Sequence, residues 1–250
     1  MPEPRRPFLT AEWRDLVMLN YVVNPGTLQP YVPSGTDLDF CDGEALISIV
    51  GFRFVKTKLQ GLAIPSHRNF EEVNLRFYVR APDAAGQMRR GVTFIREFVP
   101  RRAIAFLARL AYNEPYLALP MSSIISRSAQ GVPIKLEYRW RHGGALYRLG
   151  AETTDEAPTP PPLDSHACFV TEHYWGFTRQ RDGRTVEYEV EHPRWRVWPA
   201  TSATLEGDLT SLYGPVFADV LRGKPRSAWI AEGSQVTVFR PRLVAKEEVR

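Results

Sequence analysis

Several features that mark specialised proteins are scarce in this sequence. It has two cysteines, Cys41 and Cys168, which are too few for a disulfide scaffold or a cysteine-based metal site. No apolar run approaches the ~20 residues that a membrane-spanning helix needs. Residues 1–6 lead into mixed sequence rather than into the apolar core of a signal peptide. These absences predict a cytoplasmic protein with no membrane partner.

Lysine is scarce too, although the chain is basic overall. Of its 32 lysine and arginine residues only five are lysine, and the net charge is +4. The chain therefore offers few amines for chemistry that passes through a Schiff base. Its positive charges are interspersed with Asp and Glu along the whole sequence, which indicates a mixed, solvated surface.

Two segments, residues 139–142 and 194–196, interleave basic and aromatic residues. Such a pattern can suit single-stranded nucleic acid. On an alternating strand, however, Trp140 points away from Arg139 and Arg141. This favours a packed tryptophan between exposed arginines, and we expect no nucleic-acid partner.

Motifs for the commonest cofactors and nucleophiles are absent as well. The sequence has no Gly-x-Ser-x-Gly elbow, P-loop or dinucleotide-binding fingerprint. His166, Cys168 and His173 form the only cluster of metal-ligand type. Because a structural zinc site usually needs four ligands in tighter motifs, we expect neither a metal nor a cofactor.

What the chain does contain is a series of short strands. Apolar or alternating runs predict strands at residues 13–23, 45–55, 71–80, 91–99, 134–141, 145–151, 169–179, 185–191 and 229–239. Helical spacing predicts one main helix at residues 101–112, and a short helix falls within residues 205–222. This pattern predicts a mainly β fold with few helices, an antiparallel β-barrel or sandwich with one main mid-chain helix.

We expect one domain spanning residues 1–250, because a chain of this length suits a single all-β core. Residues 1–10 are expected to form an N-terminal arm on the surface. A cluster of prolines predicts a surface loop at residues 153–163. The loop is not taken as a domain boundary, because the short strands after it would lack a core of their own.

The segment at residues 71–80 alternates most clearly. One face is apolar and the other mostly polar, namely Val73, Leu75, Phe77 and Val79 against Glu72, Asn74, Arg76, Tyr78 and Arg80. If the polar face points into a barrel, the interior holds a polar cavity suited to a small ligand. If that face meets solvent, it is an ordinary sheet surface. The alternation alone leaves both readings open.

Four segments resemble the uncharacterised YqjF-like family, which is itself distantly similar to acetoacetate decarboxylase. They are residues 21–28, 70–74, 108–121 and 191–195, the last with Arg194 inserted into a His-Pro-Trp element. The resemblance covers most of the chain. It implies the cone-like antiparallel β-barrel of acetoacetate decarboxylase with a central pocket. It also leaves a homo-oligomer open, because that enzyme forms large assemblies.

Acetoacetate decarboxylase forms a Schiff base through a lysine, helped by an arginine and a glutamate. The resemblance puts Glu72 at the glutamate, Val22 at the arginine, and Tyr116 and Leu117 at a lysine pair. A phenol cannot form an imine, so we expect no acetoacetate decarboxylation. Lys135 is the best-placed substitute amine, but the alternation of its strand places it on the polar face.

The resemblance leaves Glu72 and Tyr116 as a carboxylate and phenol pair. A buried carboxylate with a raised pKa can carry a proton, and a phenol can donate a hydrogen bond to a developing oxyanion. We take these two as candidate catalytic residues. Weaker candidates for binding a ligand are Asn74, Arg76, Arg109 and Glu114. The pair could instead only satisfy each other's buried polar groups.

The leading hypothesis is a pocket for a small organic ligand, with cofactor-free acid/base chemistry on an oxo or hydroxy compound. The alternative is a non-catalytic binding or sensing module that uses the same cavity. A third hypothesis is a structural or nucleic-acid-interacting protein with a filled core. Interior volume beside Tyr116 would separate the first two hypotheses from the third.

Overall fold

The computed structural model describes residues 6–65, 67–83, 85–101 and 113–244, and strands dominate them. The longer strands are β1 (Pro7–Val22), β3 (Leu46–Leu59), β4 (Phe70–Pro82), β5 (Met88–Val99), β7 (Met121–Arg127), β8 (Pro133–His142), β9 (Ala145–Glu152), β11 (Thr185–Glu191) and β14 (Ser227–Phe239). The shorter ones are β2 (Asp37–Leu38), β6 (Tyr116–Ala118), β10 (Trp175–Arg179), β12 (Val197–Pro199), β13 (Ser202–Glu206) and β15 (Arg242–Leu243).

The described helices are few. They are α1 (Pro25–Leu28), the 3-10 turn η1 (Gln29–Tyr31), α3 (His166–Thr171) and α4 (Leu209–Arg222). The prediction of a mainly β fold is therefore confirmed, and so is that of a helix within residues 205–222. The predicted main helix at residues 101–112 lies, beyond its first residue, outside the described part of the chain.

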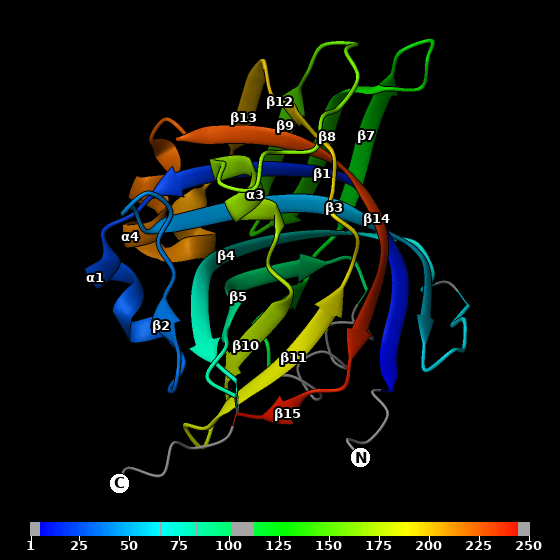
Figure 1. Ribbon diagram of the computed structural model, residues 1–250. Coiled ribbons are helices and arrows are strands. Elements are labelled where there is room, and N and C mark those ends of the chain that lie inside the picture. The colour runs from blue at the N-terminus through cyan, green and yellow to red at the C-terminus, as the bar shows by residue number, and fades with distance from the viewer. Residues whose placement is uncertain (1–5, 66, 84, 102–112, 245–250) are drawn as a thin grey trace, which may run out of the picture.

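Seven strands pair in a closed ring (Figure 1). From β14 the ring runs through β1, β3, β4, β5, β10 and β11. β11 then pairs with β14, where Val190 lies opposite Val238. The pairings in the ring are antiparallel except that between β5 and β10, and the added strand β6 also pairs in parallel with β5. A closed ring leaves fewer strand edges unpaired and has an inward face along every strand.

A second sheet, in the order β13, β9, β8, β7, packs on the outside of this ring. Its apolar side chains meet those of β1, β3, β4 and α4 in the largest core cluster. Gly51 of β3 permits this approach, because a Cβ atom there would lie 2.7 Å from the Tyr138 ring. Trp140 is 1% exposed, which confirms that it packs inside. α4 lies at one end of the long ring strands, at the left of Figure 1.

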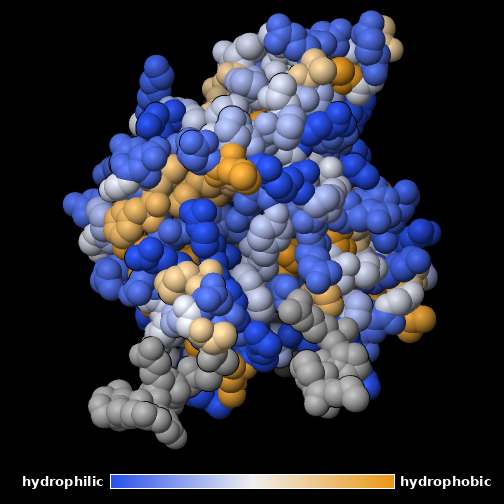
Figure 2. Space-filling model, viewed as in Figure 1, coloured by the Kyte–Doolittle hydropathy of each residue, from blue (hydrophilic) through white to orange (hydrophobic). Residues whose placement is uncertain are grey.

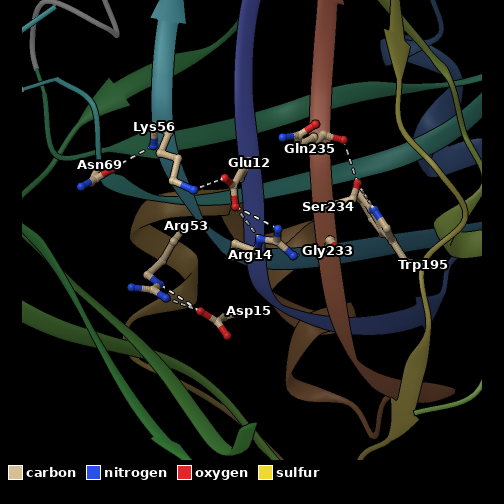
Figure 3. A network of polar contacts seen from close by, with 10 residues as sticks. All are labelled: Glu12, Arg14, Asp15, Arg53, Lys56, Asn69, Trp195, Gly233, Ser234 and Gln235. Carbon is tan, nitrogen blue, oxygen red and sulfur yellow. Dashed lines mark hydrogen bonds and ion pairs between the residues drawn. The ribbon is translucent and has the colours of Figure 1, made fainter. Parts of the chain in front are cut away.

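An acidic residue in β1 ties the ring to the second sheet. Asp15 lies at a bulge, where its backbone φ is 58° and the register with β3 shifts. Its buried carboxylate forms ion pairs with Arg53 of β3 (Figure 3) and with Arg127 of β7. Its backbone carbonyl accepts a hydrogen bond from the Tyr138 hydroxyl at 2.6 Å. These contacts hold β1 against the second sheet, and β1 also forms part of the wall of the ring.

Strand β4 is buried on both faces. The predicted apolar face packs into the core shared with the second sheet, and Val73, Leu75 and Phe77 are each 0% exposed. The opposite face points into the ring, so Glu72 and Asn74 are buried as well. The predicted alternation is confirmed, and its polar face lies against the interior instead of solvent.

Two predicted segments differ from the structure. The expected arm at residues 1–10 is partly strand, because β1 begins at Pro7 and pairs with β14 from there. The strand predicted at residues 169–179 is wrong before Trp175, because residues 169–171 belong to α3 and residues 172–174 are in neither helix nor strand. Ser165 caps that helix by accepting a hydrogen bond from the Cys168 amide at 3.1 Å. A short run buried on all sides has no periodicity that distinguishes helix from strand.

None of the described helices is long and apolar enough to cross a bilayer. Figure 2 shows one face on which hydrophilic residues dominate and apolar groups gather in small, separate areas. Residues 153–163 contain no helix or strand and form a single bridge, from Thr159 to Val197.

Candidate functional site

The ring encloses a cavity of about 340 Å³ to which all seven ring strands contribute side chains. Most of its wall is aromatic or aliphatic. Neighbouring rings contact each other along β1, β3 and β4: Trp13 lies 5.2 Å from Phe52, and Phe54 stacks on Phe70 at 4.6 Å between centroids. This volume lies within the range of small-molecule sites.

Three carboxyl groups meet at one part of this wall. Glu72 comes from β4, Glu97 from β5 and Glu114 from the segment just before β6, and each is at most 5% exposed. The register explains why they meet. Glu97 lies opposite Asn74 across β4 and β5, and opposite Tyr116 across β5 and β6. Residues directly opposite in neighbouring strands share a face.

Two phenol groups hydrogen-bond to these carboxyl groups. The Tyr116 hydroxyl donates to Glu72 Oε2 at 3.2 Å, while Asn74 Nδ2 donates to Glu72 Oε1 at 3.0 Å. The Tyr188 hydroxyl donates to Glu114 Oε1 at 2.5 Å. Within the described residues, Glu97 Oε2 is buried without a hydrogen-bond partner. The cluster therefore keeps hydrogen-bonding capacity that the protein itself does not use.

Burial makes these groups hold protons more tightly than carboxyl groups in water. It raises the pKa of Glu72 to about 7, partly opposed by the hydrogen bonds from Asn74 and Tyr116. Burial, together with the nearby Glu72 charge, raises the pKa of Glu114 to about 8 against the Tyr188 hydrogen bond. Burial and then the charges of Glu114 and Glu72 raise the pKa of Glu97 well above its usual range. Glu72 is thus poised to exchange a proton near neutral pH.

A basic residue lines the same cavity further along β4. Arg76 Nη2 donates to the Val170 carbonyl at 3.0 Å, and the guanidinium lies 5.8 Å from the centre of the Tyr78 ring. Beside Tyr78, His173 is buried, with its Nε2 3.5 Å from Asp39 Oδ2. Burial lowers the pKa of His173 to about 4, so its ring is neutral at physiological pH.

The structure brings most of the predicted site residues together. Glu72, Tyr116, Asn74, Arg76 and Glu114 all line this cavity. The sixth candidate, Arg109, lies outside the described residues.

Glu97 and Tyr188 belong to the acidic cluster of the cavity wall but were not predicted as site residues. The register of β5 against β4 skips Ile95, which is an extra residue, and the bulge reverses the alternation beyond it. Glu97 consequently faces the cavity together with Phe94, three residues earlier. The sequence feature that could have indicated Glu97 was an acidic residue between Ile95 and Phe98 in a strand expected to pair with β4.

The residues aligned with the decarboxylase's cations do not supply an amine or a guanidinium here. Val22 is 43% exposed and does not line the cavity, and Tyr116 lines it as a phenol. Among the described residues that line the cavity there is no lysine. Lys135 lies on the second sheet, where its Nζ pairs with Glu152 at 2.6 Å on the surface.

The residues of metal-ligand type do not converge. Within the described chain, no group of three or more His, Cys, Asp or Glu side chains is arranged to hold a metal ion. His166 Nε2 instead lies 3.0 Å from the Ser227 hydroxyl, and Cys168 Sγ lies 3.7 Å from Arg194 Nη2.

Solved structures with this fold include enzymes. An acetoacetate decarboxylase-like enzyme from Sphingomonas wittichii RW1 superposes with a TM-score of 0.67 at 14% identity, covering 95% of this chain and 93% of the other. Acetoacetate decarboxylase from Legionella pneumophila gives a TM-score of 0.67 at 15% identity, over 99% and 93%. The enduracididine biosynthesis enzyme MppR, complexed with pyruvate, gives 0.66 at 14% identity, over 96% and 91%. At these identities the likeness establishes the fold alone.

Sequence relatives identify the family. The chain is 26% identical over 203 residues to the uncharacterised protein YqjF of Bacillus subtilis (strain 168), covering 81% of this chain and 80% of the relative. The model of the DUF2071 family, described as an uncharacterised conserved protein, matches residues 10–235. The chain therefore belongs to the DUF2071 family of uncharacterised conserved proteins, whose member here has an acetoacetate decarboxylase-like fold.

Proposed function

We propose that the cavity binds a small organic ligand and that Glu72 and Tyr116 perform cofactor-free acid/base chemistry on an oxo or hydroxy group of that ligand. The observation that carries this proposal is a buried carboxyl with a pKa of about 7, hydrogen-bonded to a phenol inside a largely apolar cavity. Catalytic acids and bases work best when their pKa lies near the working pH.

The arrangement suits proton transfer next to a carbonyl group. An ionised Glu72 removes the proton as the C–H bond breaks, and the electron pair moves to the carbonyl oxygen. Protonation of Glu72 weakens the hydrogen bond from Tyr116, whose hydroxyl then donates to the new oxyanion. Glu97, which keeps its proton, is a second donor within the same cluster.

A decarboxylase mechanism through a Schiff base has little support. Tyr116 takes the place of the lysine, and no lysine lines the cavity among the described residues. MppR, a neighbour in fold, is known in complex with pyruvate. That complex supports the proposal that a cavity of this fold accepts a small oxo compound. The reaction proposed for this chain rests on its own residues.

The first experiment is native mass spectrometry of the purified protein, followed by release and identification of any bound molecule. We expect a retained compound with an oxo or hydroxy group. Glu72→Gln and Tyr116→Phe should then lower kcat/KM for its turnover by about 10²- to 10⁴-fold, the range for loss of a general acid or base. Glu206→Gln, at a carboxylate 55% exposed on the second sheet, is the matched control. Unchanged turnover in both cavity variants would overturn the proposal.

The alternative function is a non-catalytic binding or sensing module. It is favoured by the hydrogen bonds that Asn74 and Tyr116 already make to Glu72, which satisfy both oxygens of that carboxyl. In that case the retained compound is released unchanged after prolonged incubation, and Glu72→Gln alters its affinity only.

Several wider expectations accompany this proposal. We expect the protein to act in the cytoplasm. We also expect it not to bind nucleic acid, because Trp140 and Trp195, the tryptophans of its two basic and aromatic segments, are buried. A homo-oligomer stays open, and sedimentation velocity would measure it directly.

A further inference from the structure

Unlike Arg90 on the neighbouring strand, Arg76 forms no ion pair with an acidic residue within the described chain. Within the described residues, its polar contacts are the bond to the Val170 carbonyl and the approach to the Tyr78 ring, and its buried Nε has no hydrogen-bond partner. Arg90, on the neighbouring strand, instead pairs with Asp39 at 2.6 Å. Unpaired donors of a guanidinium at a cavity wall are available to an anion from solution.

Arg76 and the acidic cluster occupy different parts of one face of β4. With a rise of about 3.3 Å per residue, the Cα atoms of Glu72 and Arg76 lie ~13 Å apart along the strand. Phe94 is the residue opposite Arg76 on β5, while Glu97 is opposite Asn74. The cavity therefore has a proton-bearing part and a cationic part.

The rest of the cavity wall and the cavity volume indicate that the ligand has an apolar body. That body would lie between or beside the proton-bearing and cationic parts of the cavity. About 340 Å³ is far more than a carboxylate with two or three carbons fills. The rings of Trp13, Phe52, Phe54 and Phe70 cover the wall contributed by β1, β3 and β4. Such a wall is matched by alkyl or aryl groups, because these lose no hydrogen bonds when they leave water.

The charges near the cavity favour a monoanion. Among the described residues that line the cavity, Arg76 is the only arginine and the adjacent His173 is neutral, so this pair offers one full positive charge. A phosphate dianion would meet only this charge and would face repulsion whenever Glu72 ionises. A carboxylate matches the planar fork of a guanidinium and carries a single charge.

We propose that the ligand is an amphiphilic carboxylic acid, with its carboxylate on Arg76, an alkyl or aryl body against the aromatic wall, and its oxo or hydroxy group at Glu72 and Tyr116. This inference rests on the proposed function, because it assigns a ligand class to the same cavity. It adds a charge requirement and a size requirement that the acid/base proposal does not contain.

The test measures the binding of matched probes. Binding is monitored through the quenching of fluorescence from the tryptophans in the cavity wall. The probes are 4-oxo-4-phenylbutanoate, its neutral amide, and pyruvate, which keeps the charge but lacks the apolar body. We expect the aryl acid to bind at least about tenfold more tightly than either of the others. Arg76→Gln should remove the preference for acid over amide, Arg76→Lys should keep part of it, and Glu72→Gln should leave it in place.

Arg80→Gln is the matched control, because Arg80 lies on the same strand and face, is exposed and does not line the cavity. Equal affinity for acid and amide in the unaltered protein would overturn this inference while the proposed function stands. Tighter binding of pyruvate than of the aryl acid would overturn the size requirement, again while the proposed function stands. Failure of all three probes at millimolar concentration would overturn the inference, and intact turnover of a co-purified compound would still uphold the acid/base proposal.

Discussion

Around residues 72–75 the two faces of β4 are both buried and chemically opposite. On one face Val73, Leu75 and Phe77 pack against the second sheet and α4. On the other face Glu72 and Asn74 line a cavity of about 340 Å³ together with aromatic side chains. Burying carboxyl groups costs free energy unless they are paired or keep their protons. The cavity face therefore lowers the stability of the fold in a way that the filled face does not.

The largest expected effect comes from removing an aromatic side chain on the filled face. Phe77→Ala should lower the free energy of unfolding by about 4 kcal/mol, because it leaves a void in a close-packed core. Phe52→Ala, on the cavity wall, should cost about 2 kcal/mol, since part of that ring has no packing neighbour to lose. Urea unfolding measures both. Equal losses would mean that the two faces are packed alike.

A second effect is the pH dependence of stability, which should come from the cavity face. Unfolded glutamates ionise near pH 4.5, whereas Glu72 and Glu114 keep their protons in the folded state up to about pH 7 and 8. Between these limits the unfolded chain binds fewer protons than the folded one. Stability is therefore greatest at the acidic end of the window and falls as the pH rises.

We expect the free energy of unfolding to fall by about 3 kcal/mol between pH 6 and pH 7.5 because of these two groups. The double variant Glu72→Gln/Glu114→Gln should remove most of that slope, while Glu206→Gln on the surface should leave it unchanged. Denaturant unfolding at several pH values measures the slope. A slope that persists in the double variant would contradict the raised pKa values.

The smallest expected effect on stability concerns a single atom of the cavity wall, Glu97 Oε2. Glu97→Leu should raise the free energy of unfolding at pH 7 by about 1 kcal/mol, because it removes a buried oxygen that has no hydrogen-bond partner. Glu97→Gln, which keeps the size and the polarity, should change it by less than about 0.5 kcal/mol. If Glu97→Leu is instead destabilising, Glu97 makes a structural contribution that its contacts do not reveal.

Local sequence patterns account for much of the fold. Period-two alternation at residues 71–80 and 134–141 correctly predicts β4 and β8, because side chains of a strand alternate whatever lies beyond them. The strands predicted at residues 91–99 and 145–151 are also present, as β5 beside β4 and β9 beside β8. Residues 169–171 are helix instead of strand, because a short buried run carries no period, and Ser165 caps the helix that contains them.

The candidate site depended on two kinds of information. Glu72 and Tyr116 follow from the polar face of β4 and from the family resemblance, and they do meet, at 3.2 Å. Glu97 and Tyr188 do not follow from either. The bulge at Ile95 turns Glu97 toward the cavity, and closure of the ring between β11 and β14 encloses the wall to which Tyr188 belongs.

By itself the sequence determined that this chain is mainly β and that β4 has one apolar and one polar face. Only the tertiary structure decided that the polar face is interior, because that depends on β11 returning to pair with β14, far from β4 in sequence. It also decided the proton affinity of Glu72, since burial by distant strands sets the free energy of a charge there.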